Sequence, residues 1–142
     1  LIANYRRSPF FDEVYHDIQK LYNADYKNLA HFNREIIEFI CKKMGITTKF
    51  INSSALNFHS MREQKIIDIC VALNGKVYYS GTGAKSYQNE ESFKERGLEL
   101  RYSGFKIFSY PQFCGDFQSN VTILDYLMNC GYNWEQVLSN QS

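Results

Sequence analysis

The residues best suited to hold a ligand form a small glycine-spaced loop, Ser80-Gly81-Thr82-Gly83, near the middle of the chain. The strand-forming run Val77-Tyr78-Tyr79 precedes this loop, and a helix start follows it. Glycine lets the backbone come close to a ligand, and free backbone N–H groups can face an anion. The loop is therefore a candidate binding site, to which Lys85 and Tyr87 would add a cation and a phenol.

The centre of the chain predicts three β-strands that alternate with helices. β-Branched and aromatic residues predict strands at 46–51, 76–79 and 98–102. Ser60 and Glu63 form a capping box that starts the first intervening helix, and Asn89-Glu90-Glu91 starts a shorter second one. The connections are long enough for crossovers, so the strands should be parallel. The prediction is an α/β fold with a three-layer βαβαβ core and a parallel sheet.

Helices are predicted on both sides of this core. Ser8 as N-cap and Pro9 at the first helical position start a helix whose apolar residues run to Tyr22. A second helix over 29–44 would complete an N-terminal helical hairpin and end at Gly45. The C-terminal helical segment covers 122–129, ends at Gly131, and is followed by a last turn over 134–138. The whole chain, 1–142, is expected to form a single α/β domain.

Three loops should converge at the carboxyl edge of the predicted parallel sheet. They are Asn52-Ser53-Ser54, Ser80-Gly81-Thr82-Gly83 and Ser103-Gly104-Phe105. The hydroxyls and backbone donors of the first two suit a phosphate, a carboxylate or sugar hydroxyls. Small residues also serve in ordinary turns between a strand and a helix, and the spacing leaves both interpretations open.

The familiar catalytic motifs are incomplete. Gly81-x-Gly83 is not a full dinucleotide fingerprint, because Ser86 stands where the third glycine belongs and no acidic residue ends the third strand. Ser53, Ser54 or Ser80 with His59 as base would make a nucleophile pair, but no nucleophile elbow supports it. Glu91 and Asp125 are single carboxylates near helix N-termini, where stabilisation of the helix dipole explains them. They are also the carboxylates most available for proton transfer.

The charge balance excludes some partners. Sixteen basic and fifteen acidic residues leave a net charge of +1, which is no electrostatic footprint for nucleic acid or an anionic membrane. No apolar run approaches the roughly 20 residues that span a bilayer, and no signal peptide is visible. We expect a cytoplasmic protein that acts on a small molecule, with no nucleic-acid partner and no membrane insertion.

Cysteine and histidine are not arranged as metal ligands. The cysteines are Cys41, Cys70, Cys114 and Cys130, without a CxxC pair. The histidines, His16, His31 and His59, are scattered with respect to one another and to the cysteines. Reduced thiols and no structural metal are therefore expected, and no motif identifies a cofactor.

A string of short motifs along nearly the whole chain resembles the C-terminal portion of the WbqC-like family. The motifs are Ser53-Ser54-x-Leu56, Ile66-Ile67-x-Ile69-Cys70, Tyr79-Ser80-Gly81-x-Gly83-Ala84-x-x-Tyr87, Phe93-x-x-x-Gly97, Tyr110-Pro111-Gln112-x-x-x-x-Phe117 and Ile123-Leu124-Asp125-x-Leu127-x-Asn129-x-Gly131. Their order and spacing agree with the family, although no single motif is decisive. Tyr110 and Gln112 enter the list of substrate-binding candidates as motif positions.

The resemblance implies a bacterial cytoplasmic enzyme of surface-polysaccharide (O-antigen) biosynthesis that acts on a sugar or an activated precursor. A group transfer is expected, of an acyl, aminoacyl or nucleotidyl group, with Tyr87 and Tyr110 packed on the substrate. The alternative is a non-catalytic module that binds a sugar nucleotide or supports a partner enzyme. The resemblance also implies an N-terminal segment with a His-Gln-Pro-x-Tyr-x-Pro type motif, which this chain lacks. Since the chain begins Leu1-Ile2-Ala3 without Met, it is expected to be a fragment or a processed form.

Overall fold

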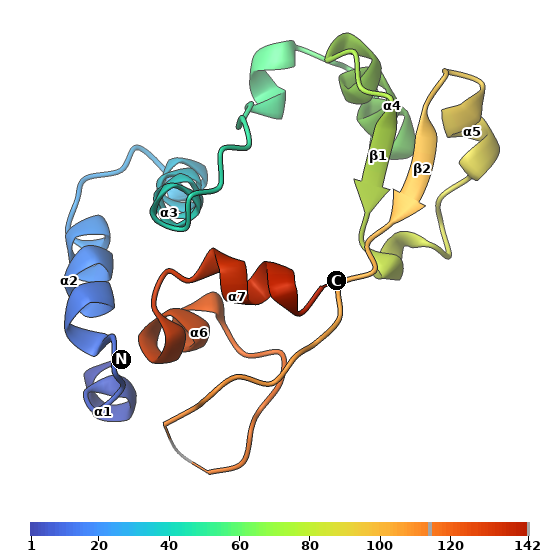
Figure 1. Cartoon of the computed structure of the whole chain (residues 1–142). Helices are drawn as coiled ribbons and strands as arrows, with labels where there is room; N and C mark the ends of the chain where they lie inside the picture. Colours follow the sequence, from blue (N-terminus) through green and yellow to red (C-terminus); the bar gives the residue numbers. More distant parts are fainter. Residues whose placement is uncertain (114, 142) are drawn as a thin grey trace. The chain divides into compact units, whose positions relative to one another are not determined.

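The computed structural model describes residues 1–113 and 115–141 as a mostly helical protein with a small parallel sheet (Figure 1). The chain divides into two compact units. The first unit comprises Leu1–Lys49 and Lys106–Ser142, and the second comprises Phe50–Phe105. The single domain expected over 1–142 stays a prediction, since units of this size occur both within one domain and as separate domains.

Five helices are described in the first unit. They are α1 (Ile2–Tyr5), α2 (Phe11–Tyr22), α3 (Leu29–Lys43), α6 (Ile123–Cys130) and α7 (Trp134–Ser139). Their apolar faces enclose a core that includes Val14, Ile18, Ile40, Leu127 and Met128. The two predicted N-terminal helices are confirmed as helices, but the backbone of α2 packs most closely against α6 rather than α3.

Ion pairs join α2 and α3 in addition to their shared apolar core. Lys43 Nζ lies 3.0 Å from Glu13 Oε1 and 3.0 Å from Asp17 Oδ2. Asp17 Oδ2 also accepts a hydrogen bond of 3.0 Å from the Tyr132 hydroxyl, and Lys43 Nζ lies 4.6 Å from the Tyr132 ring centroid. One lysine thus links α2, α3 and the segment after α6.

The second unit has a smaller core, which lies around a two-stranded sheet. Its helices and strands are α4 (Arg62–Ala72), β1 (Val77–Ser80), α5 (Glu90–Lys94) and β2 (Glu99–Tyr102), with 3-10 turns at Ser53–Leu56 and Thr82–Ala84. β1 and β2 pair in parallel, from Val77 opposite Glu99 to Ser80 opposite Tyr102. The predicted second and third strands and their parallel direction are therefore confirmed.

The predicted three-layer βαβαβ core is wrong. No strand forms over 46–51, and the sheet has only two strands among the described residues. Ile46 packs against the core of the first unit, whereas the second unit begins at Phe50. β-Branched residues favour a strand only where they can pair with a neighbouring strand and pack on a half-buried face. Thr47, Thr48, Lys49 and Ile51 are exposed, so this segment connects the two units instead.

Two predicted N-terminal helix caps are also wrong. α2 begins at Phe11, and Ser8 lies in a preceding turn, where its carbonyl accepts from the Phe11 N–H at 3.1 Å. Ser60 and Glu63 do not form a capping box, because both bond to distant groups. Ser60 Oγ donates to Asp68 Oδ2 at 2.7 Å, and Glu63 Oε2 accepts from the Asn89 N–H at 2.8 Å.

The predicted helix starts near Asn89 and Thr122 are confirmed, and each helix is capped by one local bond. Asn89 Oδ1 accepts from the Glu91 N–H at the start of α5, and Thr122 Oγ1 accepts from the Leu124 N–H at the start of α6. Gly97 and Gly131 follow α5 and α6 with φ of +72° and +69°, the left-handed backbone that favours glycine.

Gly131→Ala is expected to destabilise the protein more than Gly97→Ala, although φ is positive at both positions. At Gly131 an added Cβ would lie 2.9 Å from Phe10 Cδ1, whereas at Gly97 it would meet nothing within 4 Å. The backbone strain costs about 1 kcal/mol at each site, and overpacking adds about 1–3 kcal/mol at Gly131. Urea unfolding of both variants measures the difference, and equal losses would contradict the described contact with Phe10.

Candidate functional site

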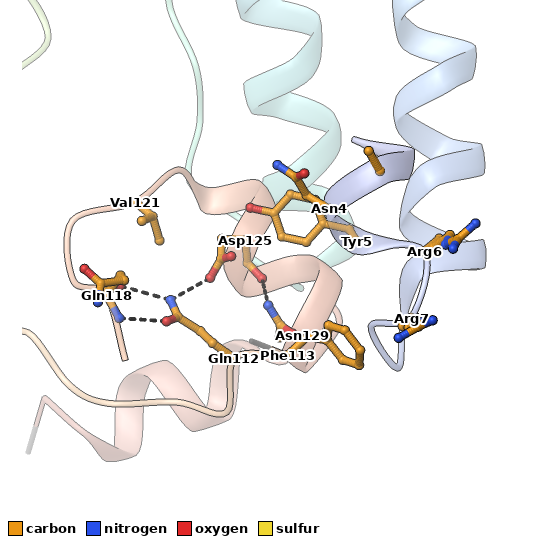
Figure 2. A pocket seen from close by; sticks show the side chains of 11 residues that line it. Asn4, Tyr5, Arg6, Arg7, Gln112, Phe113, Gln118, Val121, Asp125 and Asn129 are labelled. Atoms are coloured by element: carbon orange, nitrogen blue, oxygen red, sulfur yellow. Dashed lines mark hydrogen bonds between the residues drawn. The ribbon is translucent and has the colours of Figure 1, made fainter. Parts of the chain in front are cut away.

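A buried carboxylate, Asp125, lies at the centre of a polar cluster in the first unit (Figure 2). Thr122 starts α6, which places Asp125 in the first turn, where the helix dipole favours a negative charge. Asp125 is only 8% exposed, and its Oδ2 accepts hydrogen bonds from the Tyr110 hydroxyl at 2.9 Å and from Gln112 Nε2 at 2.8 Å. One turn later, Asn129 Nδ2 donates to the Asp125 carbonyl at 2.8 Å.

Gln112 fixes the irregular segment that precedes α6. Its Oε1 accepts from the Gln118 N–H at 2.7 Å, and its Nε2 lies 3.0 Å from the Gln118 carbonyl as well as 2.8 Å from Asp125. A single side chain thus bridges a six-residue loop and the carboxylate, as the dashed lines in Figure 2 show. The described residues of the loop form no helix or strand, so this side chain supplies hydrogen bonds that regular structure would otherwise provide.

The cluster borders a cavity of about 610 Å³. Three segments form its walls: α1 with the turn after it, the irregular segment, and α6. The lining residues are Ala3, Asn4, Tyr5, Arg6, Arg7, Gln112, Phe113, Gln118, Val121, Asp125 and Asn129. This volume lies within the usual range for small-molecule sites, and Asp125 is the one carboxylate among these residues.

The two phenols beside Asp125 keep their protons at neutral pH. Burial, together with hydrogen bonding to Asp125, raises the pKa of Tyr110 to about 12, although the bond to Gln112 acts in the opposite direction. Burial and then hydrogen bonding to Asp125 also raise the pKa of Tyr5. The Tyr110 phenol is therefore a hydrogen-bond donor to the carboxylate, at 2.9 Å. Burial raises the pKa of the nearby Cys130 thiol as well, which disfavours the reactive thiolate.

In Tyr110→Phe, the free energy of unfolding should fall less steeply with rising pH in the alkaline range than in wild type. The folded-state pKa of Tyr110 is raised from 10.0 to about 12, so the folded protein holds this proton more tightly than the unfolded chain does. The resulting stabilisation is complete below pH 10 and is lost as the pH rises through about 12. Urea unfolding at a series of pH values measures the slope. Tyr87→Phe, which removes an exposed phenol, should keep the wild-type slope; equal slopes in wild type and Tyr110→Phe would contradict the buried bond to Asp125.

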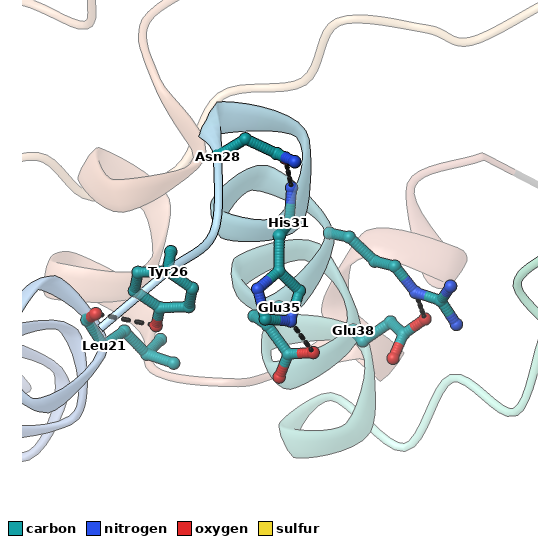
Figure 3. A network of polar contacts seen from close by, with 7 residues as sticks. Leu21, Tyr26, Asn28, His31, Glu35 and Glu38 are labelled. Carbon is teal, nitrogen blue, oxygen red and sulfur yellow. Dashed lines mark hydrogen bonds and ion pairs between the residues drawn. The ribbon is translucent and has the colours of Figure 1, made fainter. Parts of the chain in front are cut away.

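A second polar cluster in the first unit stabilises the start of α3 (Figure 3). Asn28 Oδ1 accepts from the His31 N–H at 2.9 Å, and His31 Nε2 lies 3.5 Å from Glu35 Oε1. Arg34 and Glu38 form a similar pair at 2.6 Å, three positions further along the helix. These contacts are a cap and two pairs four residues apart, which ordinary helix stabilisation explains.

The structure brings three of the predicted site residues together: Tyr110, Gln112 and Asp125. The others lie in the second unit. They are Ser53, Ser54, Ser80, Gly81, Thr82, Gly83, Lys85, Tyr87 and Glu91.

Two of the three loops expected at the sheet edge are adjacent. The Ser103 N–H donates to the Ser80 carbonyl at 2.8 Å, directly beyond the paired strands. The Ser53-Ser54 loop follows no strand, so the reason for expecting it at this edge is lost. Gly81 and Gly83 have no left-handed φ, and an added Cβ would meet nothing within 4 Å at either position. Neither packing nor backbone conformation therefore requires glycine there.

Three candidate side chains of the second unit, Lys85, Tyr87 and Glu91, do not come together in a polar cluster like that of Asp125. Lys85 Nζ lies 5.9 Å from the Tyr102 ring centroid, and the Tyr87 side chain is 75% exposed. Glu91 is an exposed carboxylate in the first turn of α5, with Oε2 3.8 Å from Lys94 Nζ. Helix stabilisation is enough to explain Glu91. Asp125 is therefore the stronger candidate for proton transfer.

Sequence reasoning missed the wall formed by α1 and its turn. Tyr5, Arg6 and Arg7 line the cavity, but α1 has only four residues and gives no helical periodicity. Asn129 was recognised as a motif position only; its spacing of four from Asp125 places both on one face of α6.

The described residues include no group of three or more His, Cys, Asp or Glu side chains able to hold a metal ion. Cys41, Cys70 and Cys130 are free thiols, and the expectation for Cys114 lies outside the described residues. In the described part of the chain, no helix has both the length and the apolar character needed to cross a membrane.

These features define a mixed α/β protein with a small parallel sheet and a polar cavity centred on one buried carboxylate. The chain belongs to the WbqC-like protein family, whose model matches residues 1–136. It is 30% identical over 132 residues to "Uncharacterized protein Rv1507c" of Mycobacterium tuberculosis (strain ATCC 25618 / H37Rv). The alignment covers 90% of this chain and 56% of that protein, so the chain spans about half the length of this curated relative. No solved structure is a significant match.

Proposed function

We propose that the chain is part of a group-transfer enzyme of bacterial surface-polysaccharide biosynthesis, which binds a sugar or an activated precursor in the cavity of the first unit. The observation that carries this proposal is the buried Asp125 carboxylate on the cavity wall, held by Tyr110 and Gln112. A carboxylate positioned by neutral donors is suited to accept a proton from a hydroxyl or an amine. Tyr110, Gln112 and Asp125 are also motif positions of the family resemblance.

In the proposed reaction, the acceptor hydroxyl or amine attacks the carbon or phosphorus atom of the transferred group. The new bond forms from the acceptor's lone pair, while the bond to the leaving group breaks and its electron pair departs with that group. The acceptor proton passes to Asp125. Tyr110 and Gln112 hold the carboxylate in place, and the amide of Asn129 fixes the helix turn beneath it.

The second unit supplies a further proposed contact surface. The backbone of Ser80–Gly83 would face a phosphate or carboxylate, with Ser53, Ser54, Lys85 and Tyr87 as additional contacts. Open space above Gly81 and Gly83 supports this proposal, because a ligand can approach the backbone there.

A non-catalytic module that binds a sugar nucleotide is the second candidate. It is favoured by the bonds that Asp125 already makes, since Oδ2 accepts two hydrogen bonds within the protein. It is favoured also by the lining of the cavity, which includes no second carboxylate, histidine or cysteine among the described residues. Acid–base catalysis commonly employs such a second group.

A ligand screen on the full-length protein tests both candidates. Thermal-shift measurements would cover nucleotides, nucleotide sugars and acyl donors, and a specific ligand at about 100 times its dissociation constant adds roughly 2.7 kcal/mol of stability. Mass spectrometry of the bound compounds then distinguishes the two candidates. Product formation supports the enzyme, binding without turnover supports the module, and stabilisation by none of the three classes would contradict both.

A further inference from the structure

Arg6 and Arg7 are two cations on the cavity wall without an internal partner. Neither guanidinium forms an ion pair or a side-chain hydrogen bond with any residue that the structure describes. Arg34 pairs with Glu38, and Lys43 pairs with Glu13 and Asp17, whereas the exposed Lys27 of the same unit, like the two arginines, has no ion pair with a described residue. The two arginines therefore have their donors available for a ligand.

Backbone contacts fix the turn that carries these arginines. The Arg6 N–H donates to the Ile2 carbonyl at 3.1 Å, and the Ser8 N–H donates to the Tyr5 carbonyl at 2.8 Å. The Phe10 N–H donates to the Met128 carbonyl of α6 at 3.1 Å. The turn is thus attached to the same helix that carries Asp125, so the cationic and acidic walls are held in register.

Arg6 and Arg7 make one side of the cavity cationic. Figure 2 shows Arg6 and Arg7 on the turn after α1, across the cavity from Gln118. Two arginines against the single carboxylate Asp125 leave the lining with a net positive charge. A cationic ligand would meet repulsion beside the arginines, whereas an anion would be attracted there. The planar guanidinium presents its donors in a fork that matches phosphate oxygens.

We infer that Arg6 and Arg7 bind a phosphoryl group of the ligand, while Asp125 faces an uncharged hydroxyl or amine of the same ligand. This inference rests on the proposed function, because it assigns the ligand class of the same cavity. It places the phosphoryl group in the first unit, whereas the Ser80–Gly83 loop is the competing site in the second unit. The reacting hydroxyl or amine then lies beside Asp125, and the bound phosphoryl group orients the ligand.

Inorganic pyrophosphate is the probe that tests this inference on the full-length protein. Isothermal titration calorimetry of wild type should detect binding that weakens as salt increases. The double variant Arg6→Ala/Arg7→Ala should lose affinity roughly tenfold or more, since each side chain contributes hydrogen bonds to a charged group. Its circular dichroism should be unchanged, because both side chains are exposed. Lys27→Ala, which removes an exposed cation of the first unit outside the cavity, should bind like wild type.

Three results would overturn the inference. One is the absence of pyrophosphate binding to wild type at millimolar concentration, and another is equal affinity of wild type and the folded double variant. The third is loss of binding in Lys85→Ala with retention in the arginine double variant, which would assign the anion to the second unit. Asp125→Asn should still bind pyrophosphate. Retained pyrophosphate binding with lost turnover in that variant would support both proposals, whereas retained turnover would contradict the catalytic proposal alone.

Discussion

Phe93→Ala is expected to unfold the second unit. Phe93 is 0% exposed, and its ring stacks on Tyr78 with centroids 5.5 Å apart and planes 4° apart. It is the largest fully buried side chain in a core that otherwise has Ile67, Leu98 and Leu100. Truncating a buried Phe to Ala costs about 3–5 kcal/mol, which is comparable to the whole stability of a small unit, about 5–15 kcal/mol.

Hydrogen exchange measured by mass spectrometry gives the readout for Phe93→Ala. Peptides that contain β1, β2 and α4 should lose protection. The matched control is Tyr87→Ala, which removes an exposed aromatic side chain from the same unit and should keep wild-type protection. Wild-type protection of β1 and β2 in Phe93→Ala would contradict the described core. The behaviour of α2 and α6 in the same experiment tests the single-domain prediction, because one cooperative domain would lose protection in the first unit as well.

Asp125→Asn is expected to lower turnover by about 10²- to 10⁴-fold, the usual contribution of a general base. The asparagine keeps the shape of the side chain but has no basic oxygen, so the acceptor proton has no receiver. Replacing an acceptor oxygen by an NH2 group next to the donors Tyr110 and Gln112 also costs about 1–3 kcal/mol of stability. The assay uses the substrate identified by the ligand screen, and circular dichroism confirms that the variant is folded.

Glu91→Gln is the matched control for Asp125→Asn. Both sequence-predicted carboxylates lie in the first turn of a helix, but Glu91 is exposed and Asp125 is buried. Glu91→Gln should therefore retain most of the wild-type turnover. Retained turnover in folded Asp125→Asn, or loss of turnover in Glu91→Gln alone, would show that Asp125 is not the proton acceptor.

The sequence predicted those features of the fold that depend on interactions between nearby residues. Thr122 and Asn89 each cap a helix through one nearby bond, and Gly97 needs only a left-handed backbone. These features depend on neighbours within a few residues, which a sequence pattern contains. The parallel pairing of 77–80 with 99–102 was predicted for a different reason, because the length of the intervening segment implies a crossover.

Features decided by distant contacts were not predicted. The segment 46–51 has strand propensity but no partner strand, and Ser60 and Glu63 bond to Asp68 and Asn89 instead of forming a cap. Propensity cannot report which distant groups compete for a side chain.

Only part of the candidate site was accessible from the sequence. Tyr110, Gln112 and Asp125 were named from motif positions, although their mutual hydrogen bonds join residues thirteen to fifteen positions apart. Arg6 and Arg7 were not named, because their place on the cavity wall arises when the turn after α1 packs on α6. A pair of adjacent arginines gives no sign of this in a chain whose net charge is +1.

The most direct test of the cavity as the ligand site is a chemical-shift map of the full-length protein with the ligand found in the thermal-shift screen. The account predicts that backbone amide shifts concentrate at Tyr5, Arg6 and Arg7, and at Gln112, Gln118, Asp125 and Asn129. Shifts confined to the second unit, around Ser80–Gly83 and Lys85, would contradict it.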